Sequence, residues 1–226
     1  LAFDFLQEGN TIHVAMYGFP RGVITSTDGG LSFGEPGSGL PSSSIVYSLV
    51  RHGNDLLAGT TEGLHVSSDD GASWQTRSSP GNIKKLISAG SSLYAGLYPG
   101  GVVHSVDGGL TWETINAGLV GEPHINDLEF FDGQLHAAVN VGVVMAWDGS
   151  RWQATGYPGE SPNDILAREN TLVAATSSGT FWKKTAGAPW EDFSAGFSQG
   201  IIEGLAATET HLVAVTRNRG FWVRNV

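Results

Sequence analysis

Three carboxylates occupy the same position in a repeated segment and are the first candidates for chemistry. Asp4, Asp127 and Asp164 each stand directly before a recurring apolar residue, a position that holds Ser48, Lys85 and Gly204 in the other copies. Two carboxyl groups roughly 5–10 Å apart across a glycosidic bond can hydrolyse it. Asp127 and Asp164, in adjacent copies, are candidates for such a pair. The alternatives are that the carboxylates line a polar binding mouth, solvate a water-filled channel or bond to neighbouring strands.

Three segments of unusual composition are the second group of candidates. MYGFPRG (16–22), LYPGG (97–101) and TRNRG (216–220) replace the plain TTEG, VNVG and TSSG of the other copies. Aromatic faces beside guanidinium groups suit sugar rings, carboxylates or a protein loop. The alternative is that long loops simply carry amphipathic residues. The candidate ligand-binding residues come from these loops, from the carboxylate position and from the position one residue before it. They are Asp4, Tyr17, Phe19, Arg21, Lys85, Tyr98, Asp127, Asp164, Glu203, Arg217 and Arg219.

An eight-residue phrase recurs and defines the repeat in which these candidates lie. It reads STDGGLSF at 26–33, SSDDGASW at 67–74 and SVDGGLTW at 105–112, shortens to AWDGSRW at 146–152, and becomes KTAGAPW at 184–190. The aligned residues Asp28, Asp69, Asp107, Asp148 and Ala186 are 41, 38, 41 and 38 positions apart. Periods of about 40 residues are typical of stacked repeat architectures.

Each repeat contains four short runs of alternating, β-branched or aromatic residues separated by Gly, Asn or Asp. Such runs predict strands, and no segment has a sustained helical period. Four-stranded units repeated in this way predict an all-β, six-bladed β-propeller of antiparallel blades, with only three strands in the last blade. We expect a single domain over 1–226, with blades near 1–40, 41–80, 81–120, 121–160, 161–198 and 199–226. Either the ring closes without a shared strand, or residues preceding Leu1 supply the missing outer strand; an exposed edge would otherwise invite pairing with another chain.

The phrase itself has the composition of a turn between the third and fourth strands. We expect the Asp carboxylate to accept hydrogen bonds from the backbone N–H groups one and two residues on, as in an Asx-turn. Gly108 and Gly109 supply positive φ. Thr111 is expected to bond back across the turn, and Trp112 to pack over it. Asp28, Asp69, Asp107 and Asp148 are therefore predicted to be structural.

The phrase resembles the Asp-box (BNR) repeat, S/T-x-D-G-G-x-T-W, of sialidases, large xyloglucanases, sortilin-type receptors and photosystem II assembly-factor-like propellers. The resemblance covers the whole chain and implies a propeller; it leaves function open, because these relatives include hydrolases and non-catalytic binding proteins. Only FPRG at 19–22 approaches the sialidase F/Y-R-I-P element, and in the wrong order, and no third arginine of a carboxylate clamp stands out. The xyloglucanase family builds its site between two propellers, and this sequence holds one.

Bulk composition narrows the classes of partner. A net charge of −10 and a pI near 5.0 disfavour nucleic acid and anionic membranes, and no run of 18 apolar residues predicts a membrane span. There is no cysteine. His13, His136 and His211 lie in dispersed repeats, so we expect no metal and no cofactor. The sequence starts Leu-Ala-Phe without an initiator Met, which fits a processed or trimmed chain, a fragment of a multi-propeller protein, or an extracytoplasmic bacterial location.

These observations predict a binding or assembly module without chemistry of its own. Its ligand, a protein or a carbohydrate, would approach the mouth opposite the Asp turns. The alternative is a glycoside hydrolase or lyase that uses Asp127 and Asp164. A carboxylate pair with displaced titration would favour the enzyme, and a broad, shallow aromatic patch would favour the binding module.

Overall fold

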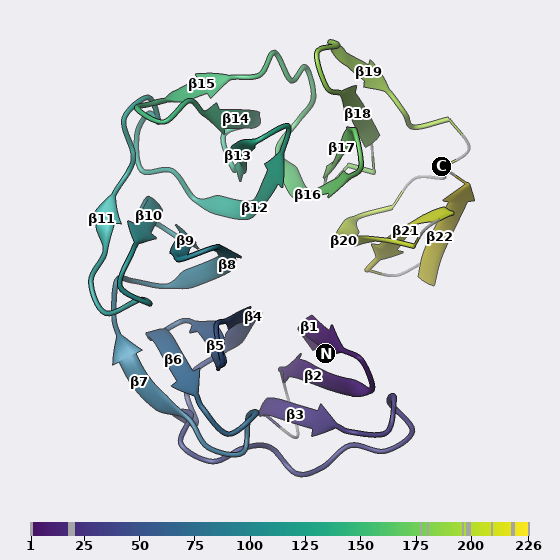
Figure 1. Ribbon diagram of the computed structural model, residues 1–226. Helices are drawn as coiled ribbons and strands as arrows, with labels where there is room; N and C mark the ends of the chain where they lie inside the picture. The colour runs from purple at the N-terminus through teal and green to yellow at the C-terminus, as the bar shows by residue number, and fades with distance from the viewer. Residues whose placement is uncertain are drawn as a thin grey trace. The chain divides into compact units, whose positions relative to one another are not determined.

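The computed structural model describes residues 2–17, 21–176, 178–179, 181–195, 197, 200–208, 210–217 and 220–225. Within this part every regular element is a β-strand and none is a helix. The chain divides into two compact units, Leu1–Ile115 and Asn116–Val226. Each unit contains three antiparallel sheets, which we number as blades 1–3 and blades 4–6 (Figure 1).

The first unit has one three-stranded and two four-stranded blades, each a meander in which consecutive strands pair. Blade 1 consists of β1 (Ala2–Glu8), β2 (Thr11–Met16) and β3 (Gly22–Ser26); blade 2 of β4 (Val46–His52), β5 (Asp55–Thr60), β6 (Gly63–Ser67) and β7 (Gln75–Ser78); blade 3 of β8 (Ile83–Ala89), β9 (Ser92–Leu97), β10 (Gly101–Ser105) and β11 (Glu113–Thr114).

The second unit repeats this plan with its three-stranded blade last. Blade 4 consists of β12 (Ile125–Phe131), β13 (Gln134–Val139), β14 (Val143–Trp147) and β15 (Trp152–Ala154); blade 5 of β16 (Pro162–Arg168), β17 (Thr171–Thr176), β18 (Phe181–Thr185) and β19 (Trp190–Asp192); blade 6 of β20 (Ile202–Ala207), β21 (His211–Thr216) and β22 (Gly220–Asn225).

These sheets confirm the predicted fold class, an all-β six-bladed propeller whose last blade has three strands. Blade 1 differs from the expected four strands. Its outer segment follows β3 without forming a strand, although Gly34 and Gly37 donate backbone hydrogen bonds to Thr25 and Val23 of β3. The stretch GEPGSG at 34–39, with three Gly and one Pro, has little propensity to extend that pairing into a strand.

Successive blades within a unit bury their apolar faces against one another. Ala15 and Val23 of blade 1 pack with Leu49 and Ala58 of blade 2. The other face of blade 2 packs on blade 3, and the same arrangement joins blades 4 to 5 and 5 to 6. A buried alanine lies at the middle of the second strand in blades 2 to 6: Ala58, Ala95, Ala137, Ala174 and Ala214.

The Asp turns, residues 26–33, 67–74, 105–112 and 146–152, connect third strands to outer segments as predicted, with different hydrogen bonding. Asp107 accepts from the N–H groups of Leu110 (3.0 Å) and Thr111 (2.9 Å), three and four residues on, and not one and two. Gly108 and Gly109, with φ of 70° and 85°, fold the chain back far enough to bring those groups to the carboxylate. The Thr111 hydroxyl donates to the same side chain at 2.6 Å, as expected. In the shortened turn, Asp148 accepts from residues two and three positions on.

These hydrogen bonds stabilise the ionised carboxylates. Hydroxyl and backbone donors from Ser32 and Ser73 lower the pKa of Asp28 and of Asp69 to about 2. The pKa values of Asp107 and Asp148 lie further below the ordinary range, chiefly because Thr111 and Gln153 donate to them. Donors that bind only the charged form of a carboxyl group lower its pKa.

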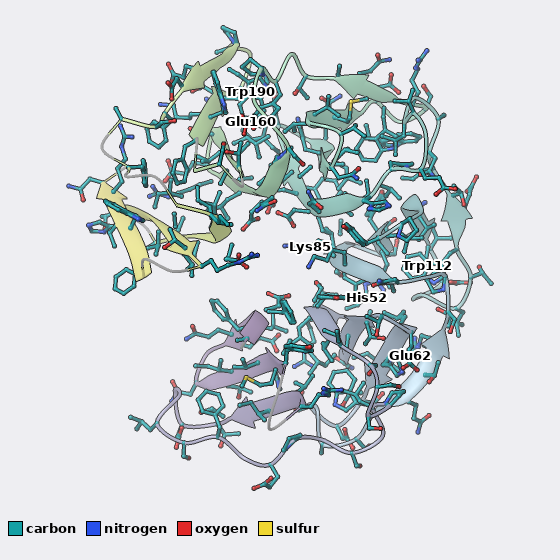
Figure 2. The ribbon with its side chains drawn as sticks, turned by 180° about the vertical axis from the view of Figure 1, so that it is seen from behind. His52, Glu62, Lys85, Trp112, Glu160 and Trp190 are labelled. Carbon is teal, nitrogen blue, oxygen red and sulfur yellow. The ribbon has the colours of Figure 1, made fainter. Side chains whose placement is uncertain are left out.

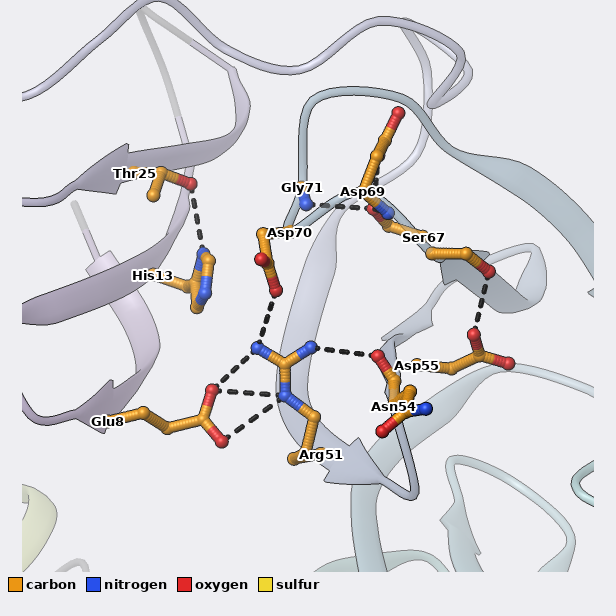
Figure 3. A network of polar contacts seen from close by, with 11 residues as sticks. Glu8, His13, Thr25, Arg51, Asn54, Asp55, Ser67, Asp69, Asp70 and Gly71 are labelled. Atoms are coloured by element: carbon orange, nitrogen blue, oxygen red, sulfur yellow. Dashed lines mark hydrogen bonds and ion pairs between the residues drawn. The ribbon is translucent and has the colours of Figure 1, made fainter.

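An ion-pair network ties blade 1 to the turn of blade 2 (Figure 3). Arg51 on β4 contacts Glu8 at the end of β1 (2.6 Å) and Asp70 in the Asp turn (3.0 Å). Beside it, His13 is fully buried and bonds Thr25 at 2.9 Å. Burial lowers the pKa of His13, the nearby Arg51 adding to the effect, so the ring is neutral near pH 7.

Candidate functional site

The carboxylates of the repeated position connect neighbouring blades. Asp4 on β1 accepts the backbone N–H of Leu49 on β4 (2.8 Å). The same contact recurs along the chain, each acceptor bonding the N–H of the recurring apolar residue in the next blade: Ser48 to Leu86 (3.1 Å), Asp127 to Ile165 (3.0 Å) and Asp164 to Leu205 (2.6 Å). We call Asp4, Ser48, Asp127 and Asp164 the anchor residues.

Two residues at the anchor position cannot form this bond. Lys85 in blade 3 offers only donors, and Gly204 in blade 6 has no side chain. These are the last blades of the two units. Lys85 on β8 lies at the inner edge of its blade and Trp112 at the outer edge (Figure 2). Partial burial raises the pKa of Asp4, while the positive charge of Lys85 opposes the rise.

The anchor contacts bear on the proposed catalytic pair. Asp127 has only 4% of its surface exposed and Asp164 is half-buried. Each already accepts a short backbone hydrogen bond. A glycosidase carboxyl group must reach the substrate at the scissile bond. Each of the two carboxylates therefore satisfies a backbone N–H group of the next blade.

Every innermost strand also carries a β-bulge one residue before the anchor position. On β1, Ala2 pairs with Met16 and Asp4 with Ala15, so that Phe3 has no paired residue of its own. The same register shift occurs in all six blades, at Phe3, Tyr47, Lys84, Asn126, Asn163 and Glu203. A bulge re-aims a side chain away from the regular alternation of a strand.

In the second unit, bulge side chains take part in polar contacts inside the unit. The Nδ2 of Asn126 donates to the carbonyl of Pro162 at 2.8 Å, and the Nδ2 of Asn163 donates to that of Ile202 at 2.9 Å. Glu203 pairs with Arg217 at 2.6 Å, with both side chains partly exposed. Arg219 and Phe19 lie outside the described residues.

In the first unit, bulge side chains form an aromatic cluster. The rings of Phe3 and Tyr47 lie 5.1 Å apart in an edge-on arrangement, and Tyr17 lies 5.7 Å from Phe3. The Nζ of Lys84 lies over the Tyr47 ring at 4.2 Å and over Phe3 at 5.4 Å. Phe3 and Tyr17 are 38% and 41% exposed, so the cluster presents aromatic surface to solvent.

Two predicted loop residues lie close to these rings. Arg21 lies over the Tyr17 ring at 5.7 Å and donates to the Ser42 carbonyl at 2.8 Å, which restricts its position. Tyr98, from the β9–β10 loop, is 42% exposed. Partial burial, with Tyr17 and Tyr98 close by, raises the pKa of Tyr47 above its ordinary value. We define the aromatic cluster as Phe3, Tyr17, Tyr47, Lys84 and Tyr98.

The structure thus brings together three of the predicted ligand-binding residues, Tyr17, Arg21 and Tyr98, in one unit. It adds Phe3, Tyr47 and Lys84, which were not among the predicted ligand contacts. The signal was present, because these three residues precede the anchor position in consecutive repeats and two are aromatic. The bulge that turns them toward one another has no sequence signature of its own.

Within the described residues, no group of three or more His, Cys, Asp and Glu side chains is placed to hold a metal ion. His65 and His136 are buried within their blades. His65 and His136 have pKa values lowered mainly by burial. The same part of the chain holds no helix with the length and apolar character needed to cross a membrane.

Comparisons with known proteins bear on fold and family. A family model described as the DUF6242 beta propeller domain matches residues 20–124. No curated protein matches the sequence. Many solved structures match the chain, and their structural likeness shows a shared fold.

Three of these structures illustrate the range of the fold. The extracellular domain of a hybrid two-component system, BT4673 of B. thetaiotaomicron, is 16% identical with a TM-score of 0.82, and the alignment covers 100% of this chain and 32% of that one. YCF48 bound to D1 peptide is 22% identical with a TM-score of 0.71, covering 97% and 76%. An ancestral GH74 enzyme is 15% identical with a TM-score of 0.77, covering 100% and 38%. The chain therefore spans about a third of the length of the first and third of these proteins.

Proposed function

We propose that this chain is a non-catalytic binding module for a protein partner, and that the aromatic cluster is its contact surface. One observation carries the proposal: three aromatic side chains from two loops and a bulge, Phe3, Tyr17 and Tyr98, stay about 40% exposed in one unit. Large apolar groups left at a surface mark interaction sites. Tyr and Arg dominate the binding energy of protein interfaces.

The charges around the cluster indicate the character of the ligand. Lys84 and Arg21 place two positive charges beside the rings in a protein of net charge −10. A peptide segment with carboxylates next to apolar side chains complements such a surface. YCF48, which shares the fold, is bound to a D1 peptide, and this supports a protein ligand over a carbohydrate.

The anchor contacts favour a binding module over a glycoside hydrolase or lyase. Asp127 and Asp164, the candidate pair, are engaged by backbone N–H groups of adjacent blades. We also propose that the first three Asp turns are Asp-box repeats, because Asp28, Asp69 and Asp107 each accept hydrogen bonds from a Ser two residues before and from a Ser or Thr four residues after. We further propose an extracytoplasmic location, supported by the likeness to an extracellular domain.

The test is a selection of random peptides on the immobilised protein, beside a glycan panel. Peptides that bind the wild type are measured against Tyr17→Ala and Tyr98→Ala. Removal of an interface aromatic that contributes about 2 kcal/mol weakens binding roughly 30-fold. Leu31→Ala, at an 89% exposed apolar residue of an Asp turn, is the matched control and is expected to leave affinity unchanged.

Two outcomes would overturn the proposal. Binding of a glycan, with no selected peptide sensitive to Tyr17→Ala, would make the module a lectin. Turnover of a polysaccharide that Asp127→Asn or Asp164→Asn abolishes would make it a hydrolase or lyase.

A further inference from the structure

Five side chains of the first unit form a series of contacts with a positive charge at each end. Three rings lie in the middle: Tyr47 is 5.1 Å from Phe3, and Phe3 is 5.7 Å from Tyr17. The Nζ of Lys84 lies 4.2 Å from the Tyr47 centroid and 5.4 Å from that of Phe3. At the other end, the Arg21 guanidinium lies 5.7 Å from the Tyr17 centroid. We call Lys84, Tyr47, Phe3, Tyr17 and Arg21 the charged row.

These distances limit the separation of the two charges. The shortest path along the charged row begins with 5.4 Å from Lys84 to Phe3. Two steps of 5.7 Å each then lead through Tyr17 to Arg21. An extended polypeptide advances roughly 3.3–3.6 Å per residue, so the two charges are no further apart than about five residues of an extended chain.

Both charged groups are held in position by contacts of their own. The ammonium of Lys84 lies over two rings, which attract it through their electron-rich faces. The Arg21 guanidinium donates to the Ser42 carbonyl at 2.8 Å, and this bond uses one of its five N–H groups. A side chain that is already restricted loses little conformational entropy when it pairs with a ligand. The charged row therefore presents two positive charges at defined positions.

The charged row concentrates the positive charge of the first unit. This unit contains five Lys and Arg residues: Arg21, Arg51, Arg77, Lys84 and Lys85. Arg51 and Arg77 form ion pairs with carboxylates of the unit. Arg21 and Lys84 lie on aromatic faces, and Lys85 follows Lys84 on β8. An acidic ligand thus meets complementary charges at the charged row, in a protein whose net charge of −10 disfavours it elsewhere.

A cationic ligand fits this arrangement poorly. Aromatic faces attract ammonium and guanidinium groups, but the rings of Tyr47 and Tyr17 already hold cations of this chain. A cation from a partner would have to displace Lys84 or Arg21 and would meet charge of the same sign. A carboxylate at each end instead pairs with these groups. Apolar side chains between the two carboxylates can cover Phe3 and Tyr17, which are 38% and 41% exposed.

We propose that the charged row binds an extended segment of a partner protein in which two acidic residues, about five residues apart or fewer, bracket an aromatic or aliphatic core. One carboxylate pairs with Lys84 and the other with Arg21, while the core covers the rings between them. This inference rests on the binding function proposed above, and it adds the residue pattern that the partner segment must contain.

The probes are peptides selected from a random twelve-residue library on the immobilised protein, with affinities measured by fluorescence anisotropy. We expect the selected peptides to carry two acidic residues around an aromatic or aliphatic core. Replacing either acid by its amide is expected to weaken binding about three- to fivefold, the contribution of one exposed ion pair. Lys84→Met keeps an apolar side chain over the rings and removes its charge, and Arg21→Gln removes the other charge. Each variant is expected to cause a similar loss of affinity.

Double-mutant cycles assign the two ends. Once the acid that faces Lys84 has been replaced, Lys84→Met is expected to cause no further loss, and the same holds for the other acid and Arg21→Gln. Lys84→Arg keeps the charge and is expected to retain wild-type affinity, which separates loss of charge from loss of folding. Lys183→Gln, at a lysine of the second unit that pairs with Glu191, also removes one positive charge. It is the matched control and is expected to leave affinity unchanged.

Three outcomes would overturn the inference, and they separate it from the proposed function. Peptides that lose affinity with Tyr17→Ala, but whose acids couple to neither Lys84 nor Arg21, would leave the binding module standing and refute the charge pattern. Selected peptides rich in Lys and Arg would make the charged row a site for cations. If no selected peptide responds to Tyr17→Ala, the proposed function fails, and the inference that rests on it fails with it.

Discussion

Replacement of Asp127 by alanine tests whether the anchor residues hold adjacent blades together. Asp127 is 4% exposed and accepts the N–H of Ile165, a residue with 1% exposure, at 3.0 Å. Alanine removes a hydrogen bond to a charged group and leaves a buried N–H without an acceptor. Such losses cost about 1.5–3 kcal/mol. In a domain of this size each kcal/mol shifts the Tm by roughly 2–4 °C, so the expected decrease is about 3–12 °C.

The assay combines thermal unfolding with hydrogen exchange of the Ile165 amide. Asp127→Asn keeps an acceptor of the same shape and is expected to lose less stability than Asp127→Ala. Glu129→Ala, on the same strand, is half-buried and serves as the control for a general effect of removing an acid from β12. If Asp127→Ala unfolds at the wild-type temperature and the Ile165 amide exchanges no faster, the anchor interpretation is wrong. A functional role for the Asp127 carboxylate would then be favoured over a structural one.

Two further predictions concern the turns and the outer tryptophans. Trp152→Ala, at 1% exposure, is expected to cost about 3–5 kcal/mol in chemical denaturation. Phe33→Ala, at the equivalent but 44% exposed position, is expected to cost less than about 1 kcal/mol. Similar losses in the two variants would contradict a stabilising effect of burying the Trp152 ring. The pKa values of Asp28 and Asp69 are lowered to about 2 in the folded chain, so they contribute stability that is fully present above pH 4 and is lost as the pH falls towards 2. Tm values measured from pH 6 to pH 2 should decline in this window, and the decline should be smaller in Asp28→Asn. An unchanged slope of Tm against pH in that variant would refute the assignment.

The fold could be predicted well because each repeat contains residues that are typical of turns. Gly108 and Gly109 adopt the positive φ values that their types permit, and the Asp that precedes them is hydrogen-bonded within the turn. The detail that was wrong, the offset of the N–H donors to Asp107, depends on how tightly two consecutive glycines turn the chain. Residue types alone do not determine that distance.

The candidate site was harder to predict because it depends on bulges and on packing. Tyr17 and Tyr98 were found from the length and composition of their loops. The side chains of Phe3, Tyr47 and Lys84 are oriented by a register shift. From the sequence alone, an aromatic residue at this position is equally consistent with a core strand. The carboxylates were identified as a set, but whether they face a ligand or a neighbouring N–H group depends on the distance between adjacent strands.

The anchor bonds and the apolar faces act together at the junctions of successive blades within each unit. Each unit has two junctions between successive blades, and each junction contains one anchor bond: Asp4 and Ser48 in the first unit, Asp127 and Asp164 in the second. The last blade of each unit has Lys85 or Gly204 at this position, and neither can accept a hydrogen bond there. Blades linked by both apolar packing and an anchor bond form one compact body. Ser48→Ala removes the anchor bond between blades 2 and 3 and leaves their apolar faces in place. Faster hydrogen exchange of the Leu86 amide in this variant would show that the anchor bond contributes to the junction, and unchanged exchange would show that apolar packing alone holds these two blades together.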